Sequence, residues 1–270
     1  MRSILRQFAA RAAKTVAVAA VFVSASASAV TLPDLGLSSD QVSSIDRQLY
    51  SPGASPAVAF GSPIAFGPGY TEFFAGIGGQ TLPDGAPDDY DGAASVGFGI
   101  GDPFRWIGLE VSSTIISLQD DFGHDGNFNL KLHHALPWRS AIAIGVENTG
   151  RWGDAKATES SAYLALTKAF EVAPPSSGVP LTLSLNAGVG DNRFAKPGDS
   201  GIGGFGSVAF TFARRISIVG DYTGRDLNVG ASLVPFKRVA LVITAGMINL
   251  GERYGAETEF AGGIGYTHRF

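Results

Sequence analysis

Hydrophobic and polar residues alternate along most of the chain after about residue 69. Leu181, Leu183 and Leu185, for example, alternate with Thr182 and Ser184. A period of two puts successive side chains on opposite faces, which is typical of a β-strand with one apolar and one polar face. Each such stretch is about ten residues long, the length that a tilted strand needs to cross a bilayer. The alternation predicts twelve strands: 69–80, 91–101, 104–117, 126–136, 138–148, 160–171, 180–190, 203–213, 215–224, 226–234, 237–248 and 259–270.

The connections between these stretches alternate in length. Short or intermediate connections follow the second, fourth, sixth, eighth and tenth strands, and longer ones follow the first, third, fifth, seventh and eleventh. The tight turn after the ninth strand breaks this rule. One end of the molecule would therefore carry short turns and the other long loops, as in outer-membrane barrels. We predict an all-β fold, a transmembrane antiparallel up-and-down β-barrel of about 12 strands, with 10–14 compatible with the pattern.

A secreted β-sandwich or jelly roll is the alternative, because it also uses short alternating strands. Three features favour the membrane barrel. The apolar faces carry almost no charge, and the polar faces are rich in Gly, Ser, Thr, Ala and Asn. Aromatic residues lie near strand ends, where a membrane-interface girdle is expected. These are Trp106, Trp138, Phe170, Phe212, Tyr222, Phe236, Tyr266 and Phe270.

The first residues have the pattern of a secretory signal peptide. Four basic residues precede an apolar run at 15–23, and a small-x-small cleavage pattern ends at Ala29. The run is much shorter than the ~20 residues of a membrane-spanning helix. We therefore expect a signal peptide at 1–29 and a barrel at 69–270. Between them, the Pro-, Gly- and Ser-rich stretch 30–68 predicts a periplasmic lead-in, or a partial plug that folds into the barrel mouth and narrows the lumen.

Composition narrows the classes further. The chain is 45% hydrophobic and 16% charged, with 36 Gly and no Cys, which argues against a disordered acidic chain or a disulfide scaffold. Removing residues 1–29 takes away four basic residues and no acidic ones, leaving 16 Lys and Arg against 24 Asp and Glu, a net charge of −8. This acidity argues against nucleic acid as a partner.

The chain ends on the strand "GIGYTHRF". With its terminal Phe270 and with Tyr266 four residues earlier, this strand resembles the C-terminal signal strand of Gram-negative outer-membrane β-barrels. His268 departs from the hydrophobic residue usual at its position. The resemblance implies residence in the outer-membrane lipid, recognition by the barrel-assembly machinery, and an assembly signal at Tyr266 and Phe270. We expect the strand to close the barrel against residues 70–80, because a strand in hydrocarbon cannot keep an open edge.

A second resemblance concerns two internal strands. "DYTGRDLNVGASL" at 221–233 and "AYLALTKAF" at 162–170 are similar to stretches of the outer-membrane YjbH-type proteins that are linked to exopolysaccharide export. What this similarity implies is a carbohydrate or exopolysaccharide cargo.

Charged residues at alternate positions are expected to line the lumen. The candidates are Glu110, Lys131, His133, Arg139, Glu147, Asp221 and Arg269. Charges of both signs on neighbouring strands can pair across the interior, because a barrel holds its charges away from lipid. The same residues can instead line a narrow aqueous path for polar solutes. The pattern allows both interpretations.

Motifs for catalysis or metal binding are weak. None of His124, His133, His134 and His268 has the neighbouring Ser of a lipase-like site, and no P-loop or zinc motif occurs. Asp84, Asp88, Asp89 and Asp91 are oxygen ligands that could hold Ca²⁺, but their spacing does not fit an EF-hand, so a solvated external loop is expected. We expect no enzyme activity and no cofactor.

The leading functional hypothesis is a small pore or export conduit for polar solutes. A closed structural or adhesive barrel that binds partners through its acidic external loops is the alternative from another class. A lipid-modifying enzyme at the barrel rim is a third.

Overall fold

A computed structural model describes residues 54–83, 89–116, 118, 122–199 and 201–270. The expected signal peptide and residues 30–53 of the expected lead-in lie outside these residues. The described residues form twelve β-strands and four short 3-10 helices. The strands are β1 (Glu72–Thr81), β2 (Tyr90–Gly101), β3 (Gly108–Ile116), β4 (Asp125–Leu136), β5 (Ser140–Trp152), β6 (Ser161–Ala173), β7 (Leu181–Gly190), β8 (Gly203–Phe212), β9 (Ile216–Tyr222), β10 (Leu227–Leu233), β11 (Leu241–Ile248) and β12 (Glu259–Arg269). The 3-10 helices are η1 (Gly153–Ala157), η2 (Pro175–Ser177), η3 (Asn192–Phe194) and η4 (Arg253–Gly255).

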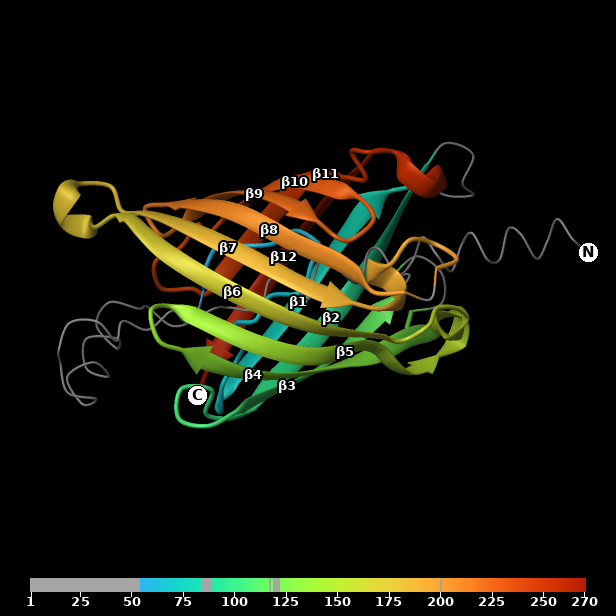
Figure 1. Ribbon diagram of the computed structural model, residues 1–270, viewed down its shortest axis with the longest axis horizontal. Helices are drawn as coiled ribbons and strands as arrows, with labels where there is room; N and C mark the ends of the chain where they lie inside the picture. Colours follow the sequence, from blue (N-terminus) through green and yellow to red (C-terminus); the bar gives the residue numbers. More distant parts are fainter. Residues whose placement is uncertain (1–53, 84–88, 117, 119–121, 200) are drawn as a thin grey trace, which may run out of the picture.

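The strands form one closed up-and-down barrel in which each strand pairs antiparallel with its sequence neighbours (Figure 1). The barrel closes between the first and last strands. β12 pairs with β1 in a register that sets Arg269 opposite Glu72 and Ile264 opposite Ile77. Phe270 extends this pairing, because its backbone N–H donates to the carbonyl of Thr71 over 3.0 Å. The predicted fold class, strand number and closure of the chain's ending are confirmed.

The two ends of the barrel differ, as Figure 1 shows. The end at left carries the connections after β2, β4, β6, β8 and β10 and the C-terminus, and we call it the short-turn end. The end at right carries the connections that follow β1, β3, β5, β7, β9 and β11, and we call it the long-loop end. The β9–β10 connection, residues 223–226, is the short exception at that end.

Several strand boundaries differ from the prediction for local reasons. β3 begins at Gly108 rather than near residue 104. The side chain of Asp102 accepts the backbone N–H of Phe104 over 2.9 Å, and its carbonyl accepts that of Trp106 over 2.9 Å. These two bonds fold 102–106 into a turn, because an Asp side chain offers the backbone an alternative to the strand ladder. β5 in turn continues to Trp152, past an irregularity in its register with β4.

The outward face of the barrel is apolar. Large hydrophobic side chains on it are exposed in strand after strand around the barrel. They include Ile77, Val96, Phe98, Leu130, Leu132, Ile142, Ile144, Leu164, Leu166, Leu185, Val208, Phe210, Ile218, Val229, Ile243, Met247, Phe260 and Ile264. Among the described residues, no helix has the length and apolar character to span a membrane.

The inward face, in contrast, is polar or small, and the space inside is occupied. Residues 54–69, which precede β1, lie within the barrel (blue in Figure 1), and we call them the luminal segment. Phe60 of this segment packs with Ala93, Val219 and Ala261 of the wall, and Ile64 belongs to a second apolar cluster. Of the two alternatives for residues 30–68, a periplasmic lead-in or a partial plug, the described residues 54–68 have the position of a plug.

Candidate functional site

The barrel lumen is the candidate site, because buried polar and charged side chains converge there. Successive strands show the alternation directly: in β3 the inward residues Glu110, Ser112 and Thr114 are each at most 3% exposed. Asp221 of β9 is 1% exposed and Asn228 of β10 is 4% exposed. Buried polar groups cost free energy unless they are hydrogen-bonded. Many of the partners here are atoms of the luminal segment.

The luminal segment first runs from the short-turn end toward the long-loop end. The backbone N–H of Ala57 donates to Ser232 Oγ over 2.9 Å, and its carbonyl accepts the hydroxyl of Ser217 over 2.6 Å. Ser217 is near the start of β9 and Ser232 near the end of β10, so both lie close to the short turns. The carbonyl of Val58 then accepts the hydroxyl of Ser207 over 2.7 Å.

The segment reverses direction at Gly61, next to Asp221. One carboxylate oxygen of Asp221, Oδ2, accepts the N–H of Phe60 at 2.6 Å, the N–H of Ser62 at 3.2 Å and the hydroxyl of Ser62 at 2.9 Å. Gly61 has φ +135°, and a Cβ added there would lie 2.8 Å from Asn228 Nδ2. Glycine therefore fits the tip on two grounds, the backbone conformation and the lack of space.

The segment then returns toward the short-turn end along β6 and β4. The N–H of Ala65 donates to Thr167 Oγ1 over 2.8 Å. The ammonium of Lys131 donates to the carbonyl of Phe66 over 2.9 Å, and His133 Nε2 lies 3.1 Å from the carbonyl oxygen of Pro68. Both limbs thus end at the short-turn end, and the segment is a re-entrant loop inside the barrel.

A charged cluster lies directly beneath the returning limb. Lys131 Nζ is 2.6 Å from Glu110 Oε2, and both side chains are at most 5% exposed. The two residues face each other across β3 and β4, and His133 faces Gly108 in the same ladder. A Cβ added at Gly67 would lie 2.8–2.9 Å from side-chain atoms of all three charged or titratable groups. The chain can pass this cluster closely because residue 67 has no side chain.

The β7–β8 loop covers the long-loop end of the lumen. Arg193 of η3 forms an ion pair with Glu147 of β5 and donates to the carbonyl of Gly61 over 3.2 Å. Phe194, next to it, is completely buried and packs 4.6 Å from the ring of Phe205. Arg193 therefore connects the tip of the luminal segment to the wall and to the loop above it.

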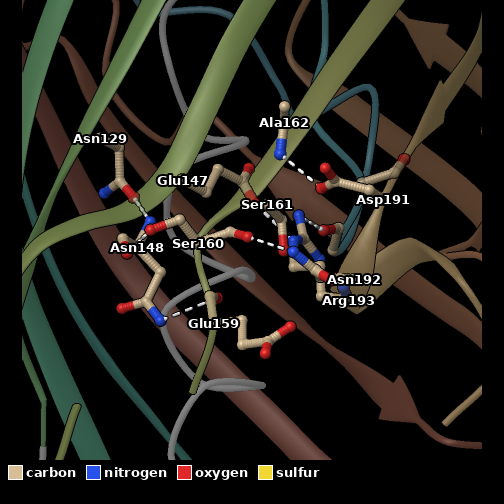
Figure 2. Close-up of polar contacts among 12 residues, drawn as sticks. Asn129, Glu147, Asn148, Glu159, Ser160, Ser161, Ala162, Asp191, Asn192 and Arg193 are labelled. Atoms are coloured by element: carbon tan, nitrogen blue, oxygen red, sulfur yellow. Dashed lines mark hydrogen bonds and ion pairs between the residues drawn. The ribbon is translucent and has the colours of Figure 1, made fainter. Parts of the chain in front are cut away.

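Polar contacts also join this loop to the end of the β5–β6 loop and to the start of β6, as Figure 2 shows. The Asn192 side chain donates to the Ser160 carbonyl at 2.5 Å, and the N–H of Ala162 donates to Asp191 Oδ1 at 2.7 Å. The N–H of Arg193 donates to the hydroxyl of Ser161 at 3.1 Å. These contacts hold Arg193 above the lumen.

A third connection, the β9–β10 turn, contacts the β7–β8 loop at the long-loop end. The guanidinium of Arg225 donates to the carbonyls of Ala195 at 2.6 Å and Asn192 at 2.7 Å. Burial lowers the pKa of Arg225, and the positive charge of Arg193 acts in the same direction. Burial likewise raises the pKa of the neighbouring carboxyl group of Asp226. The partly desolvated guanidinium of Arg225 is thus held by carbonyl groups of the β7–β8 loop.

The structure places the predicted lumen residues in two groups. Five lie inside the barrel and are between 1% and 7% exposed: Glu110, Lys131, His133, Glu147 and Asp221. The other two lie at the short-turn end. Arg139 is in the β4–β5 turn with φ 56° and pairs with Glu171 over 3.0 Å. Arg269 has a side chain that is 62% exposed, 3.9 Å from Glu72.

The residues expected as an assembly signal lie on the outward side of β12 or beyond it. Tyr266 is 41% exposed and Phe270 is 85% exposed. Of the acidic candidates for Ca²⁺, Asp84 and Asp88 lie outside the described residues. Asp89 is exposed, and Asp91 accepts the N–H of Gly92 at 2.6 Å. Among the described residues, no group of three or more His, Asp or Glu is arranged to hold a metal ion.

The sequence reasoning missed the residues that bind the luminal segment most closely beside Asp221. These residues are uncharged: Thr167, Asn186, Asn228, Ser207, Ser217 and Ser232. Uncharged polar residues of this kind occur on the inward face of every strand. Their alternation did indicate the inward face, which is the signal that could have found them. Arg193 lies in a loop, where no periodic pattern marks its direction.

Comparison of the chain with protein-family models and with curated proteins finds no match. The similarity to YjbH-type proteins therefore stays a prediction. What the arrangement itself provides is a polar lumen whose interior is occupied by a segment of the same chain.

Proposed function

We propose that this chain is an outer-membrane β-barrel that forms a small conduit for polar solutes, and that the luminal segment closes the conduit in the described state. The polar solutes would pass only when residues 54–69 leave the lumen. The proposal has two parts, the membrane setting and the conduit, and each rests on its own observations.

The membrane setting is supported by the inverted distribution of polarity. Apolar side chains lie exposed on the outside and polar ones are buried inside, the reverse of a soluble barrel and the pattern of a barrel in lipid. Closure between β1 and β12 also leaves no free strand edge, which hydrocarbon would not tolerate because water is absent there. Export to the outer membrane fits both features.

The observation that carries the conduit is that a separate segment fills the interior. Where the segment packs, many wall residues are small, such as Ala141, Ala143, Ala165 and Ala209, and the rings of Tyr163 and Phe205 belong to the same cluster as the first three. A barrel of purely structural role can fill its interior with wall side chains. Here removal of the segment would leave a lumen lined by these small residues, by the two rings and by polar groups that water can solvate.

The test is the conductance of the purified protein in planar lipid bilayers. The mature full chain should show little steady current, because the luminal segment occupies the path. A variant that lacks residues 54–68 should show steady single-channel conductance. Retention of a heat-modifiable gel shift and of β-sheet circular dichroism shows that the variant still forms the barrel.

A correctly folded deletion variant without conductance would contradict the conduit. It would favour the closed structural barrel, the alternative that the burial of the luminal polar groups supports. The carbohydrate cargo expected from the similarity to YjbH-type proteins stays a prediction, which conductance block by oligosaccharides would test.

A further inference from the structure

Most hydrogen bonds between the wall and the luminal segment involve the main chain of the segment, and Ser62 is the segment residue whose side chain also takes part. From this we propose that the lumen is a binding track for an extended polypeptide and that it can hold a peptide supplied by another molecule. The inference rests on the proposed function in one respect, that the segment can leave the lumen. It adds the class of chain that the vacant lumen recognises.

Carbonyl oxygens of the segment meet donors from five strands and one loop. A donor group of the wall or loop lies within 2.6–3.2 Å of each of seven carbonyls: Ser217 at Ala57, Ser207 at Val58, Asn228 at Phe60, Arg193 at Gly61, Asn186 at Pro63, Lys131 at Phe66 and His133 at Pro68. A regular series of carbonyl acceptors is a property of a peptide chain.

Backbone N–H groups meet acceptors in the same way. Ser232 accepts from Ala57, Thr167 accepts from Ala65, and Asp221 accepts from both Phe60 and Ser62. Two nearby N–H groups that converge on one carboxylate oxygen form a small anion-binding concavity, made by the peptide itself. The track therefore matches donors and acceptors of a peptide on both sides of the chain.

The side chains of the segment restrict which peptide sequences fit the lumen mainly through their size. Phe60, Ile64 and Phe66 pack in two apolar clusters that contain Ala residues of the wall together with larger ones such as Tyr163 and Phe205, and Gly61 and Gly67 pass where a Cβ would not fit. Recognition through the main chain tolerates many sequences, provided that the residues are small at the narrow points. A neutral glycan offers no carbonyl series to these donors, so the contacts favour a polypeptide over a carbohydrate.

The experiment measures binding of a labelled synthetic peptide with the sequence of residues 54–69 to detergent-solubilised protein by fluorescence anisotropy. The variant that lacks 54–68 should bind the peptide saturably. The matched full-length chain, whose lumen is occupied, should not. A second peptide, N-methylated at the nitrogens of Phe60 and Ser62, loses both main-chain bonds to Asp221 and keeps the bond from the Ser62 hydroxyl. It should bind about tenfold more weakly or worse, since hydrogen bonds to charged groups are the strong ones.

Equal affinity of the two peptides would overturn the proposal, and so would displacement of the peptide by a neutral oligosaccharide at similar concentration. If the deletion variant fails to form the heat-modifiable barrel alone, refolding with the unmethylated peptide should restore that band. Failure to restore it would also overturn the proposal. Because binding is measured without current, a variant that binds the peptide but does not conduct would contradict the conduit alone.

Discussion

Some buried charged residues of the lumen stabilise the luminal segment, and others stabilise the barrel wall. Asp221 belongs to the first kind. Its Oδ2 takes three hydrogen bonds from the tip of the luminal segment. A charged acceptor strengthens each bond relative to a neutral one. The cost of burying the carboxylate is thus offset by the segment, and by water if the segment leaves. Asp221 therefore stabilises the state in which the segment fills the lumen, and water can replace the segment as its partner.

Lys131 shows the other role, because the carboxylate that pairs with it, Glu110, is part of the wall, while its ammonium also donates to the Phe66 carbonyl of the luminal segment. Replacement by Met leaves Glu110 buried without its cation, and breaking a buried ion pair in this way costs roughly 3–5 kcal/mol. We therefore expect Lys131→Met to lower the urea midpoint of unfolding strongly, measured by the heat-modifiable gel shift in lipid vesicles. The matched control is Arg105→Met, whose side chain is 82% exposed and pairs with Asp102 at 3.6 Å.

The control variant should unfold nearly as the parent does, because exposed ion pairs contribute little. If Lys131→Met unfolds at the same urea concentration as Arg105→Met, then Lys131 and Glu110 are not a buried pair. The double variant Lys131→Met with Glu110→Leu separates the charge from the packing. It should recover most of the lost stability, because no unpaired charge then remains inside.

At the scale of elements, β12 closes the barrel against β1 and also carries the residues expected to act as the assembly signal. Phe270 is 85% exposed, and its ring contacts the exposed ring of His268 at a centroid distance of 4.7 Å. Little of the packing inside the barrel therefore depends on it. We predict that deletion of Phe270 strongly lowers the amount of assembled barrel in cells while refolding of the purified chain in detergent is nearly unchanged. The same deletion thereby separates recognition from folding.

The two measurements for this variant are the heat-modifiable band in outer-membrane fractions and the yield of refolding in vitro. A change at Asp88, in the loop expected to be external, serves as the comparison and should affect neither. Normal assembly of the Phe270 deletion in cells would contradict the role assigned to the chain's ending.

The elements also show how far the sequence could be read. Alternation predicted all twelve strands, because each strand has an apolar outward face and a small or polar inward face, which gives a period of two. The late start of β3 was missed, since the turn at Asp102 depends on side-chain hydrogen bonds that compete with the strand pattern. The number and order of the strands depend on local alternation and were predicted best, whereas several strand boundaries differ from the prediction.

The luminal segment could not be located in the same way. Its sequence is rich in Pro, Gly and Ser, which is also the composition of a linker. The partners that fix it are 65 to 175 residues away in sequence, as for Phe66 with Lys131 and Ala57 with Ser232. Local pattern therefore left two alternatives for 30–68. Asp221 was predicted as a position facing the lumen, and in the structure it is 1% exposed and bonded to the luminal segment, a partner that the sequence did not predict.

At the scale of the whole molecule, the barrel combines an apolar exterior with a lumen that is filled by a re-entrant loop. Both ends of that loop lie at the short-turn end, next to the C-terminus (Figure 1). In an outer-membrane barrel this end faces the periplasm. A loop that enters and leaves on one side can be withdrawn without threading the chain through the barrel. Under the proposed function, opening would therefore proceed from the periplasmic side.

The most direct test of the central claim fixes the luminal segment to the wall. The chain has no Cys, so the pair Ala65→Cys and Thr167→Cys supplies the two thiols, at positions joined by a hydrogen bond of 2.8 Å. The account predicts that oxidation forms a disulfide in native membranes, that the oxidised protein is silent in bilayers, and that reduction allows opening events. Failure of the disulfide to form in folded barrels whose thiols react after unfolding, or steady conductance in the oxidised state, would contradict it.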